Sequence, residues 1–189
     1  RINLMRSFAG ESQARNRYTY AAEAAKSQSL HVIEAVFKFT ANQEKEHGKI
    51  FYNYLKEMTG ENITIDGSYP VDIYDDVLKL LRSAQHNEFE EFEPVYPDFA
   101  AVANQEGFTN IGAKFNQIAK IEKTHGDRFG MFADLLEQGK LFVSDVEEEW
   151  MCLNCGYVHK SSEAPKSCPV CSHPQGYFVR LKLAPFTTL

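Results

Sequence analysis

Two copies of a Glu-x-x-His motif, Glu44 to His47 and Glu122 to His125, interrupt the apolar stripes of two long helical segments in this chain. A spacing that alternates between four and three residues keeps side chains on one buried face of a bundle helix. The two stripes read Ile33, Phe37, Thr40, Glu44, His47, Phe51, Tyr54, Met58 and Ile111, Phe115, Ile118, Glu122, His125, Phe129, Phe132, Leu136. Residues three apart share a helix face, so each motif presents a carboxylate and an imidazole to one point inside a helical bundle.

The helical pattern predicts a mainly α fold, with a four-helix bundle over residues 1–145 and a small module over residues 146–189. Turn-forming residues gather near positions 59–70, 94–97 and 107, and they divide the pattern into segments. We predict long helices over residues 4–27, 31–58, 71–93 and 109–138, a short helix near 99–106, and an acidic linker over 143–149.

The other two long helices carry glutamates in their own stripes, Glu11 in the first helix and Glu88 and Glu91 in the third. Glu11 precedes Glu44 by 33 residues, and Glu88 precedes Glu122 by 34, so one helix pair occurs twice as a weak internal repeat. Such a repeat supplies matching halves of a two-metal site.

Five glutamates facing one core would repel one another, because burying an unpaired carboxylate costs several kcal/mol. Two divalent cations bring a charge of +4 against −5 and leave the two histidines neutral as nitrogen ligands. A Glu from each of two helices plus Glu-x-x-His from each of the other two is the ligand set of ferritin-like di-iron and di-manganese bundles. Oxygen and imidazole ligands suit iron or manganese without excluding zinc, and we favour iron.

A plainer interpretation applies to some of these residues. A single Glu-x-x-His is more often a solvated helix face, so the metal hypothesis depends on two copies in register with four stripes. Glu91 has weaker support, because the acidic run around it also fits a solvated face. The remaining histidines lie off the stripes and are interpreted as surface or packing residues: His31, His86, His159 and His173.

The second motif is a pair of Cys-x-x-Cys sequences, Cys152 with Cys155 and Cys168 with Cys171, separated by twelve residues. This arrangement brings four thiolates into a tetrahedron around zinc or a single iron, and the spacing alone leans toward structural zinc. Disulfides are a poor alternative in a reducing cytosol. A module this short depends on its metal to fold, with a core of aromatic residues: Trp150, Tyr157, Tyr177 and Phe178.

The bulk properties narrow the classes of partner. The formal net charge is −6 without a block of basic residues, which disfavours nucleic acid. A run of about 18 apolar residues is lacking, as is a signal-peptide pattern near the first residue, so we expect a cytoplasmic protein without a membrane partner.

With these residues in hand, the chain resembles the rubrerythrin family over essentially its whole length, from the segment Phe8 to Tyr18 to the rubredoxin-like segment Cys152 to Cys171. The resemblance implies a ferritin-like bundle with two non-haem irons that reduces hydrogen peroxide to water. It also implies that an iron at the four cysteines, rather than zinc, relays electrons. The electrons would come from NAD(P)H through an external donor protein, either a rubredoxin or a nicotinamide-dependent reductase. A head-to-tail homodimer is expected, because the bundle site lies roughly 20 Å from the end of its last helix.

The same resemblance assigns roles to single residues. Glu91, with Glu88 beside it, would carry protons, and His47 would exchange with Glu91 at one iron. Tyr18 and Tyr96 match tyrosines that the family places next to its ligands, although packing is their plainer role. The di-iron ligands would be Glu11, Glu44, Glu88, Glu91, Glu122 and His125. Ser172 departs from the glycine that is usual after the last cysteine of free-standing rubredoxins.

Two other functions share these motifs. A ferritin-like ferroxidase would oxidise ferrous iron with oxygen and use the same bundle ligands. A zinc-ribbon binding module on a helical scaffold would be no enzyme at all, with zinc at both sites.

Overall fold

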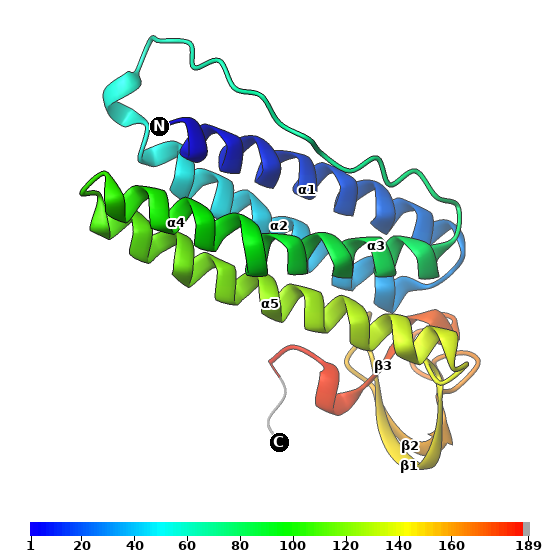
Figure 1. Ribbon diagram of the computed structural model, residues 1–189. Coiled ribbons are helices and arrows are strands. Elements are labelled where there is room, and N and C mark those ends of the chain that lie inside the picture. The colour runs from blue at the N-terminus through cyan, green and yellow to red at the C-terminus, as the bar shows by residue number, and fades with distance from the viewer. Residues whose placement is uncertain (187–189) are drawn as a thin grey trace.

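Five α-helices and a three-stranded sheet form the described part of the chain, residues 1–186, in a computed structural model (Figure 1). Among these residues, none of the helices combines the length with the apolar character that crossing a membrane requires. The prediction of a mainly α fold, with a bundle followed by a small cysteine-containing module, is confirmed. Positions 187–189 of the predicted module lie outside the described residues. The helices are α1 (Ile2–Ser27), α2 (His31–Asn53), α3 (Val77–Glu90), α4 (Tyr96–Gln105) and α5 (Thr109–Glu137).

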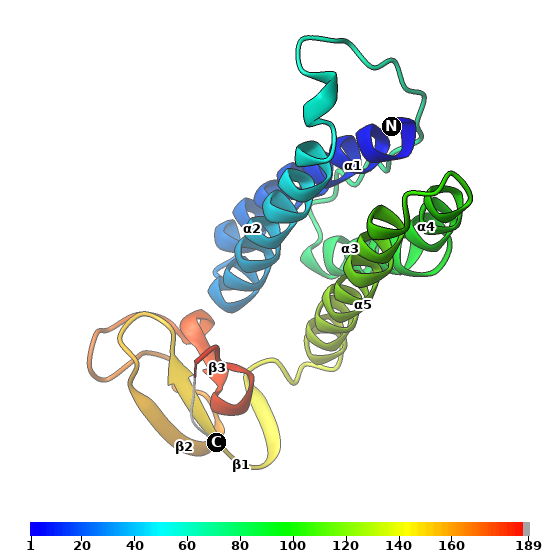
Figure 2. The same cartoon turned by 90° about the vertical axis from the view of Figure 1, so that its left-hand side faces the viewer.

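The bundle consists of two helix pairs that face each other (Figure 2). One pair is α1 with α2, and the other is α5 with the continuous helix formed by α3 and α4. Two apolar clusters fill the space between the pairs, one around Phe37 and Phe129 and the other around Phe51 and Phe115. The Glu-x-x-His motifs lie in the sequence between these aromatic residues, so the polar site is enclosed by apolar packing at both ends.

A long connection, which we call the strap (residues 59–76), joins the two pairs and runs beside α1 (Figure 1). The expected helix ends at Met58 and Val71 are therefore wrong. The second helix ends at Asn53 and a 3-10 turn, Lys56–Met58, follows it. The third begins only at Val77, because the Asp76 carboxylate accepts the backbone N–H of Leu78 at 2.8 Å and caps the helix there.

The turn predicted near positions 94–97 is also wrong, because the chain stays helical there. A π-helical segment, Glu91–Val95, connects α3 directly to α4. Pro94 lacks the N–H that an α-helical hydrogen bond needs, and the wider π turn accommodates it. Pro97 is tolerated because it lies in the first turn of α4. Glu91 is the first residue of the π segment, so the irregularity lies at the predicted site.

The C-terminal module is an antiparallel sheet in the order β2-β1-β3, formed by β1 (Val143–Cys152), β2 (Val158–Glu163) and β3 (Phe178–Arg180). The segment 143–149, expected as a linker, is therefore the first part of a strand. Its acidic side chains are mostly exposed, and its pairing with β2 shifts register before Glu148. Trp150 and Phe178 are fully buried, and Tyr157 and Tyr177 pack against them, which confirms the predicted aromatic core.

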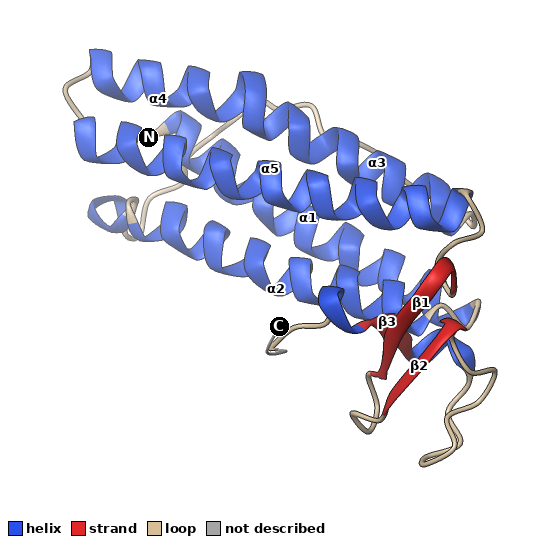
Figure 3. Ribbon diagram, turned by 90° about the horizontal axis from the view of Figure 1, so that it is seen from below, coloured by secondary structure: helices blue, strands red, loops and turns tan. Residues whose placement is uncertain are grey.

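The module packs against one end of the bundle (Figure 3). Tyr177 stacks on His31 at the start of α2, with ring centroids 4.0 Å apart. Gly176 lies so close to the Ser29 carbonyl oxygen that a Cβ atom would be 1.8 Å from it, so only glycine fits at this contact. The cysteine site is therefore held at the α1–α2 turn of its own bundle.

Candidate metal centres

Six ionisable side chains from four helices converge in the bundle core, and each is at most 6% exposed. Helix α1 supplies one glutamate, α2 a glutamate and a histidine, α3 one glutamate, and α5 the second glutamate and histidine pair. The six residues are Glu11, Glu44, His47, Glu88, Glu122 and His125. The apolar stripes that surround these positions force them inward, as their register predicts.

The six side chains form two overlapping clusters. In one cluster Glu11 and His47 lie with Glu44 and Glu122, and every residue offers one donor atom within 4.8 Å of the others. The second cluster combines Glu88 and His125 with the same two glutamates, within the same distance. Because Glu44 and Glu122 belong to both clusters, each can bridge two ions. The arrangement therefore fits two metal positions that share two carboxylates.

Inside the clusters His47 Nδ1 forms a hydrogen bond with Glu44 Oε2 at 3.1 Å, but other contacts are short and lack hydrogen-bond geometry. His125 Nδ1 lies 2.9 Å from Glu44 Oε1 and 2.9 Å from Glu122 Oε2. Nevertheless, neither His125 nitrogen nor either Glu122 carboxylate oxygen has a hydrogen-bond partner among the described residues. The same holds for Glu11 Oε2, Glu44 Oε1 and Glu88 Oε2. Buried polar atoms without partners are costly, whereas lone pairs that converge on one point suit a coordinated cation.

Burial and mutual repulsion shift the acid–base behaviour of the glutamates. Burial, followed by the charge of Glu44, raises the pKa of Glu88 to about 8. Burial also raises the pKa of Glu11 well above its usual value, and the charge of Glu122 adds to this effect. Burial opposes ionisation of Glu44 too, but the imidazole rings of His125 and His47 beside it outweigh burial and lower its pKa to about 2. Without cations, the cluster therefore has to hold protons that metal binding would displace.

The stability of the metal-free protein should consequently fall as the pH rises. Glu88 titrates near 4.5 when unfolded and near 8 when folded, so its contribution is complete below pH 4.5 and is lost through pH 8. His47 acts in the same direction, because Glu122 and Glu44 outweigh its burial and raise its pKa to about 9. We expect chelator-treated protein to lose about 2 kcal/mol or more of unfolding free energy from about pH 5 to pH 9. Urea titrations followed by circular dichroism measure this, and an equally steep loss in the metal-loaded protein would contradict the explanation.

Two buried tyrosines donate hydrogen bonds to glutamates of the clusters. The Tyr96 hydroxyl donates to Glu11 Oε1 at 2.5 Å, and the Tyr18 hydroxyl donates to Glu88 Oε1. Burial, followed by the charge of the adjacent glutamate, raises the pKa of each tyrosine well above 10. Both phenols therefore remain protonated donors that fix one oxygen of each carboxylate and leave the other oxygen free for a metal.

Glu91 is the one predicted bundle ligand that lies outside both clusters. Its side chain is only partly buried, and it lines a cavity of about 530 Å³ between α1, the strap and the π segment. Burial, followed by the charge of Glu122, raises its pKa well above the usual value. His47 occupies a place in the first cluster, so the structure brings this histidine and not Glu91 to the metal position.

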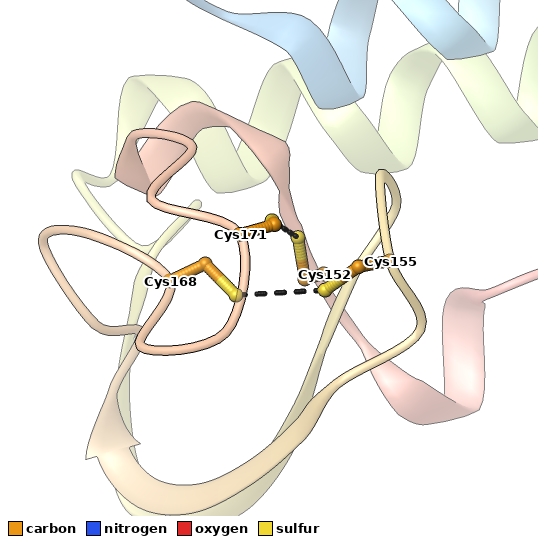
Figure 4. Close-up of side chains that lie close together, drawn as sticks. All are labelled: Cys152, Cys155, Cys168 and Cys171. Carbon is orange, nitrogen blue, oxygen red and sulfur yellow. Dashed lines mark hydrogen bonds between the residues drawn. The ribbon is translucent and has the colours of Figure 1, made fainter.

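The four cysteines of the C-terminal module point toward one another from two loops (Figure 4). The Sγ atoms of Cys152 and Cys171 are 3.7 Å apart, and those of Cys155 and Cys168 are 3.6 Å apart. A disulfide needs about 2.05 Å. Four sulfurs placed about 2.3 Å from one ion have tetrahedral edges of about 3.8 Å, so these separations fit a single bound metal.

Two similar turns shape the cysteine site. The Gly156 N–H donates to the Cys152 carbonyl oxygen at 2.8 Å, and the Ser172 N–H donates to that of Cys168 at 2.9 Å. Both turning residues have positive φ, +77° for Gly156 and +61° for Ser172. A serine in this left-handed conformation has a steric cost that a glycine lacks. The replacement of the usual glycine by Ser172 should therefore strain this turn slightly.

Apart from Glu91 itself and Tyr96, the residues that line the cavity beside Glu91 were not predicted as functional. They include Ser7 and Gly10 on α1 and Tyr69 on the strap. Gly10 is the kind of signal that could have drawn attention to this face, because a glycine inside a helix costs about 1 kcal/mol relative to alanine. The strap has no periodic pattern, so the sequence did not indicate that it would cover the site.

Comparison with protein families supports two modules in the order observed. The family model described as Rubrerythrin matches residues 3–133, and the model described as Rubrerythrin, rubredoxin-like domain matches residues 150–179. The chain is 46% identical to a rubrerythrin of Clostridium perfringens over 177 residues, which cover 93% of this chain and 91% of that relative. It is 45% identical to a rubrerythrin of Porphyromonas gingivalis, covering 95% of this chain and 88% of that relative.

Solved structures give the same architecture. Nigerythrin in its fully reduced, all-ferrous state matches with a TM-score of 0.64 at 28% identity, covering 94% of this chain and 84% of that chain. A bacterioferritin of Desulfovibrio desulfuricans with a diiron site matches with a TM-score of 0.64 at 20% identity, covering 73% and 80%. The second similarity concerns the fold alone, and it confirms the predicted ferritin-like bundle.

Proposed function

The chain belongs to the rubrerythrin family, and from this premise we propose that it is a non-haem di-iron peroxidase that reduces hydrogen peroxide to water and protects against oxidative stress. Its bundle is a rubrerythrin di-iron domain with a carboxylate and histidine site, and its C-terminal module is a rubredoxin-like domain with a four-cysteine site. The observation that supports the proposal most strongly is the pair of clusters that share Glu44 and Glu122.

We assign each cluster one iron. Glu11 and His47 would hold the first iron and Glu88 and His125 the second, while Glu44 and Glu122 bridge the two. Iron at the four cysteines completes the assignment, although zinc fits the same sulfur geometry. The domain boundary near residue 145 is part of this proposal and remains a prediction.

Reduction of hydrogen peroxide to two molecules of water consumes two electrons and two protons. The two irons supply the electrons when they are bound. Protons have to pass from solvent to the buried site, and Glu91 is suited to this because it lies between the cavity and the clusters. Glu88 lies one helical turn away, and the Tyr18 hydroxyl bonded to it keeps its carboxylate in place.

We further propose that His47 and Glu91 alternate at the first iron as the redox state changes. The arrangement with His47 in the cluster and Glu91 at the cavity corresponds to one of the two alternatives. The π turn that begins at Glu91 supports the exchange, because single π turns inside α-helices occur frequently at functional sites.

Electrons for the next turnover would come from NAD(P)H through an external donor protein and the cysteine-bound iron, in the cytoplasm. Within one chain the module packs at Ser29 and His31, and Glu44 lies thirteen residues further along α2, roughly 20 Å away. This separation supports a head-to-tail dimer, in which the module of one chain serves the bundle of the other.

The kinetic test compares two oxidants. Stopped-flow mixing of the reduced, iron-loaded protein with hydrogen peroxide should oxidise the bundle irons at least about 100-fold faster than mixing with oxygen. A ferritin-like ferroxidase would prefer oxygen and build an iron mineral under excess ferrous iron. A colourless protein with zinc at both sites would instead indicate the zinc-ribbon binding module.

A further inference from the structure

The cavity beside Glu91 is lined by α1 on one side and by the strap on another. Gly10 has an open side toward this gap, where a Cβ atom would be 3.8 Å from Glu91 Oε1 and 3.8 Å from Tyr69 Cε1. A methyl group on Gly10 would therefore be in van der Waals contact with both the tyrosine ring and the carboxylate. We propose that Gly10 and Tyr69 form a size-limiting passage that admits hydrogen peroxide to Glu91 and excludes bulkier hydroperoxides. The proposal rests on the proposed peroxidase function and adds its substrate selectivity.

The ring of Tyr69 is held in place from several sides. Its hydroxyl donates to the Arg6 carbonyl oxygen at 3.3 Å. Gly67 packs against the ring so closely that a Cβ atom would be 2.7 Å from it. Arg6 Nε donates to the Asp66 carbonyl oxygen at 3.2 Å, and the two side chains form an ion pair. The strap is thus fastened to α1 next to the passage, so the ring has a defined position and a defined effect on the width.

The walls of the cavity also favour a small polar molecule. Ser7 lies one helical turn before Gly10, is 3% exposed, and its hydroxyl has no hydrogen-bond partner among the described residues. Arg17 Nε is likewise buried without a hydrogen-bond partner among the described residues, although it forms an ion pair with Asp72 Oδ2 at 3.7 Å. Hydrogen peroxide donates and accepts at both ends and can satisfy such groups. An alkyl group would leave them unpaired, which adds a penalty to the steric one.

The first test compares hydroperoxides of different size. In the iron-loaded protein, the second-order rate constant for oxidation by hydrogen peroxide is divided by that for tert-butyl hydroperoxide. Tyr69→Ala should lower this ratio at least about tenfold, whereas Tyr69→Phe, which keeps the ring, should leave it within about twofold. Gly10→Ala adds one methyl group and should slow both oxidants, the bulky one more strongly. An unchanged ratio in Tyr69→Ala with full iron content would overturn the proposal.

Gly10→Ala also provides a second variant for this test in case Tyr69→Ala does not fold. Alanine is the better helix former, and its Cβ meets only ordinary van der Waals distances. If Tyr69→Ala does not fold, Gly10→Ala decides the question. A higher ratio of the rate constant for hydrogen peroxide to that for tert-butyl hydroperoxide in this variant would support the passage, and an unchanged ratio would overturn it.

A second test does not depend on peroxide chemistry. In the zinc-loaded protein the four native thiolates are bound, and Ser7→Cys adds one thiol inside the cavity. Methyl methanethiosulfonate should label this thiol at least about tenfold faster than benzyl methanethiosulfonate, as followed by intact mass. Adding Tyr69→Ala should remove the difference, and adding Tyr69→Phe should keep it. Equal labelling rates with the ring in place would refute the passage even if the peroxidase assay succeeds, and selective labelling would support it even if that assay fails.

Discussion

Exchange of Glu122 for glutamine should leave the bundle unable to hold two irons and should lower peroxide reduction by at least about 100-fold. Glu122 contributes to both clusters, with Oε1 3.0 Å from His47 Nδ1 and Oε2 2.9 Å from His125 Nδ1. Glutamine keeps the shape, but it removes the negative charge and replaces one ligand oxygen by an N–H donor. Iron analysis together with a peroxidase assay measures both effects.

The same substitution should change the stability of the metal-free protein by no more than about 1 kcal/mol. It relieves repulsion among the buried carboxylates, but it also removes the attraction of Glu122 for His47 and His125, and the two effects oppose each other. Glu90→Gln is the matched control, because this neighbour of the site has an exposed side chain and should change neither iron content nor stability. Retention of two irons in Glu122→Gln would refute the bridging assignment.

Replacement of Cys152 by serine should separate the two metal sites functionally. Cys152 is fully buried at the end of β1, and without its thiolate the module should lose its iron, its visible iron–thiolate absorption and its fold. Steady-state turnover with NAD(P)H and a donor protein should fall by at least about 100-fold. A single oxidation of the chemically reduced bundle by peroxide should stay within about twofold of the unmodified protein, because the bundle ligands are untouched.

The control for this experiment is Ser162→Ala, an exposed position on β2 outside the two Cys-x-x-Cys segments. It should keep the colour and the turnover. If Cys152→Ser kept full steady-state turnover, electrons would reach the bundle without the cysteine site, and the relay would be wrong.

The convergence of six bundle side chains could be predicted from the sequence because burial imposes a strict period on a helix. Glu44 and Glu122 occupy positions where the stripe demands an apolar residue, and a polar residue there has to face the core. The cysteine site was predictable for a different reason, since its two loops are local and their spacing sets the sulfur geometry. In both cases the positions of the side chains follow from short-range regularity.

Other features could not be predicted from the sequence, because they depend on contacts between segments that are distant in the chain. Pro94 reads as a helix breaker, but packing of the surrounding helix against α5 keeps the chain helical through a π turn. The segment that begins at Val143 reads as a solvated linker, because its acidic side chains face solvent while its backbone pairs with β2. The position of Tyr69 beside Gly10 is set by the path of the strap, which carries no periodic signal.

The central claim is that a di-iron centre in the bundle receives its electrons from an iron bound by the cysteines. An anaerobic titration of the fully reduced protein with hydrogen peroxide tests this claim most directly. Iron is quantified in the same sample, and the visible iron–thiolate band is recorded. Each peroxide accepts two electrons, so about three irons per chain should consume about 1.5 equivalents of peroxide, with the band appearing as the cysteine iron is oxidised. Bundle irons that stay ferrous after this addition, or zinc at the cysteines with no band, would contradict the account.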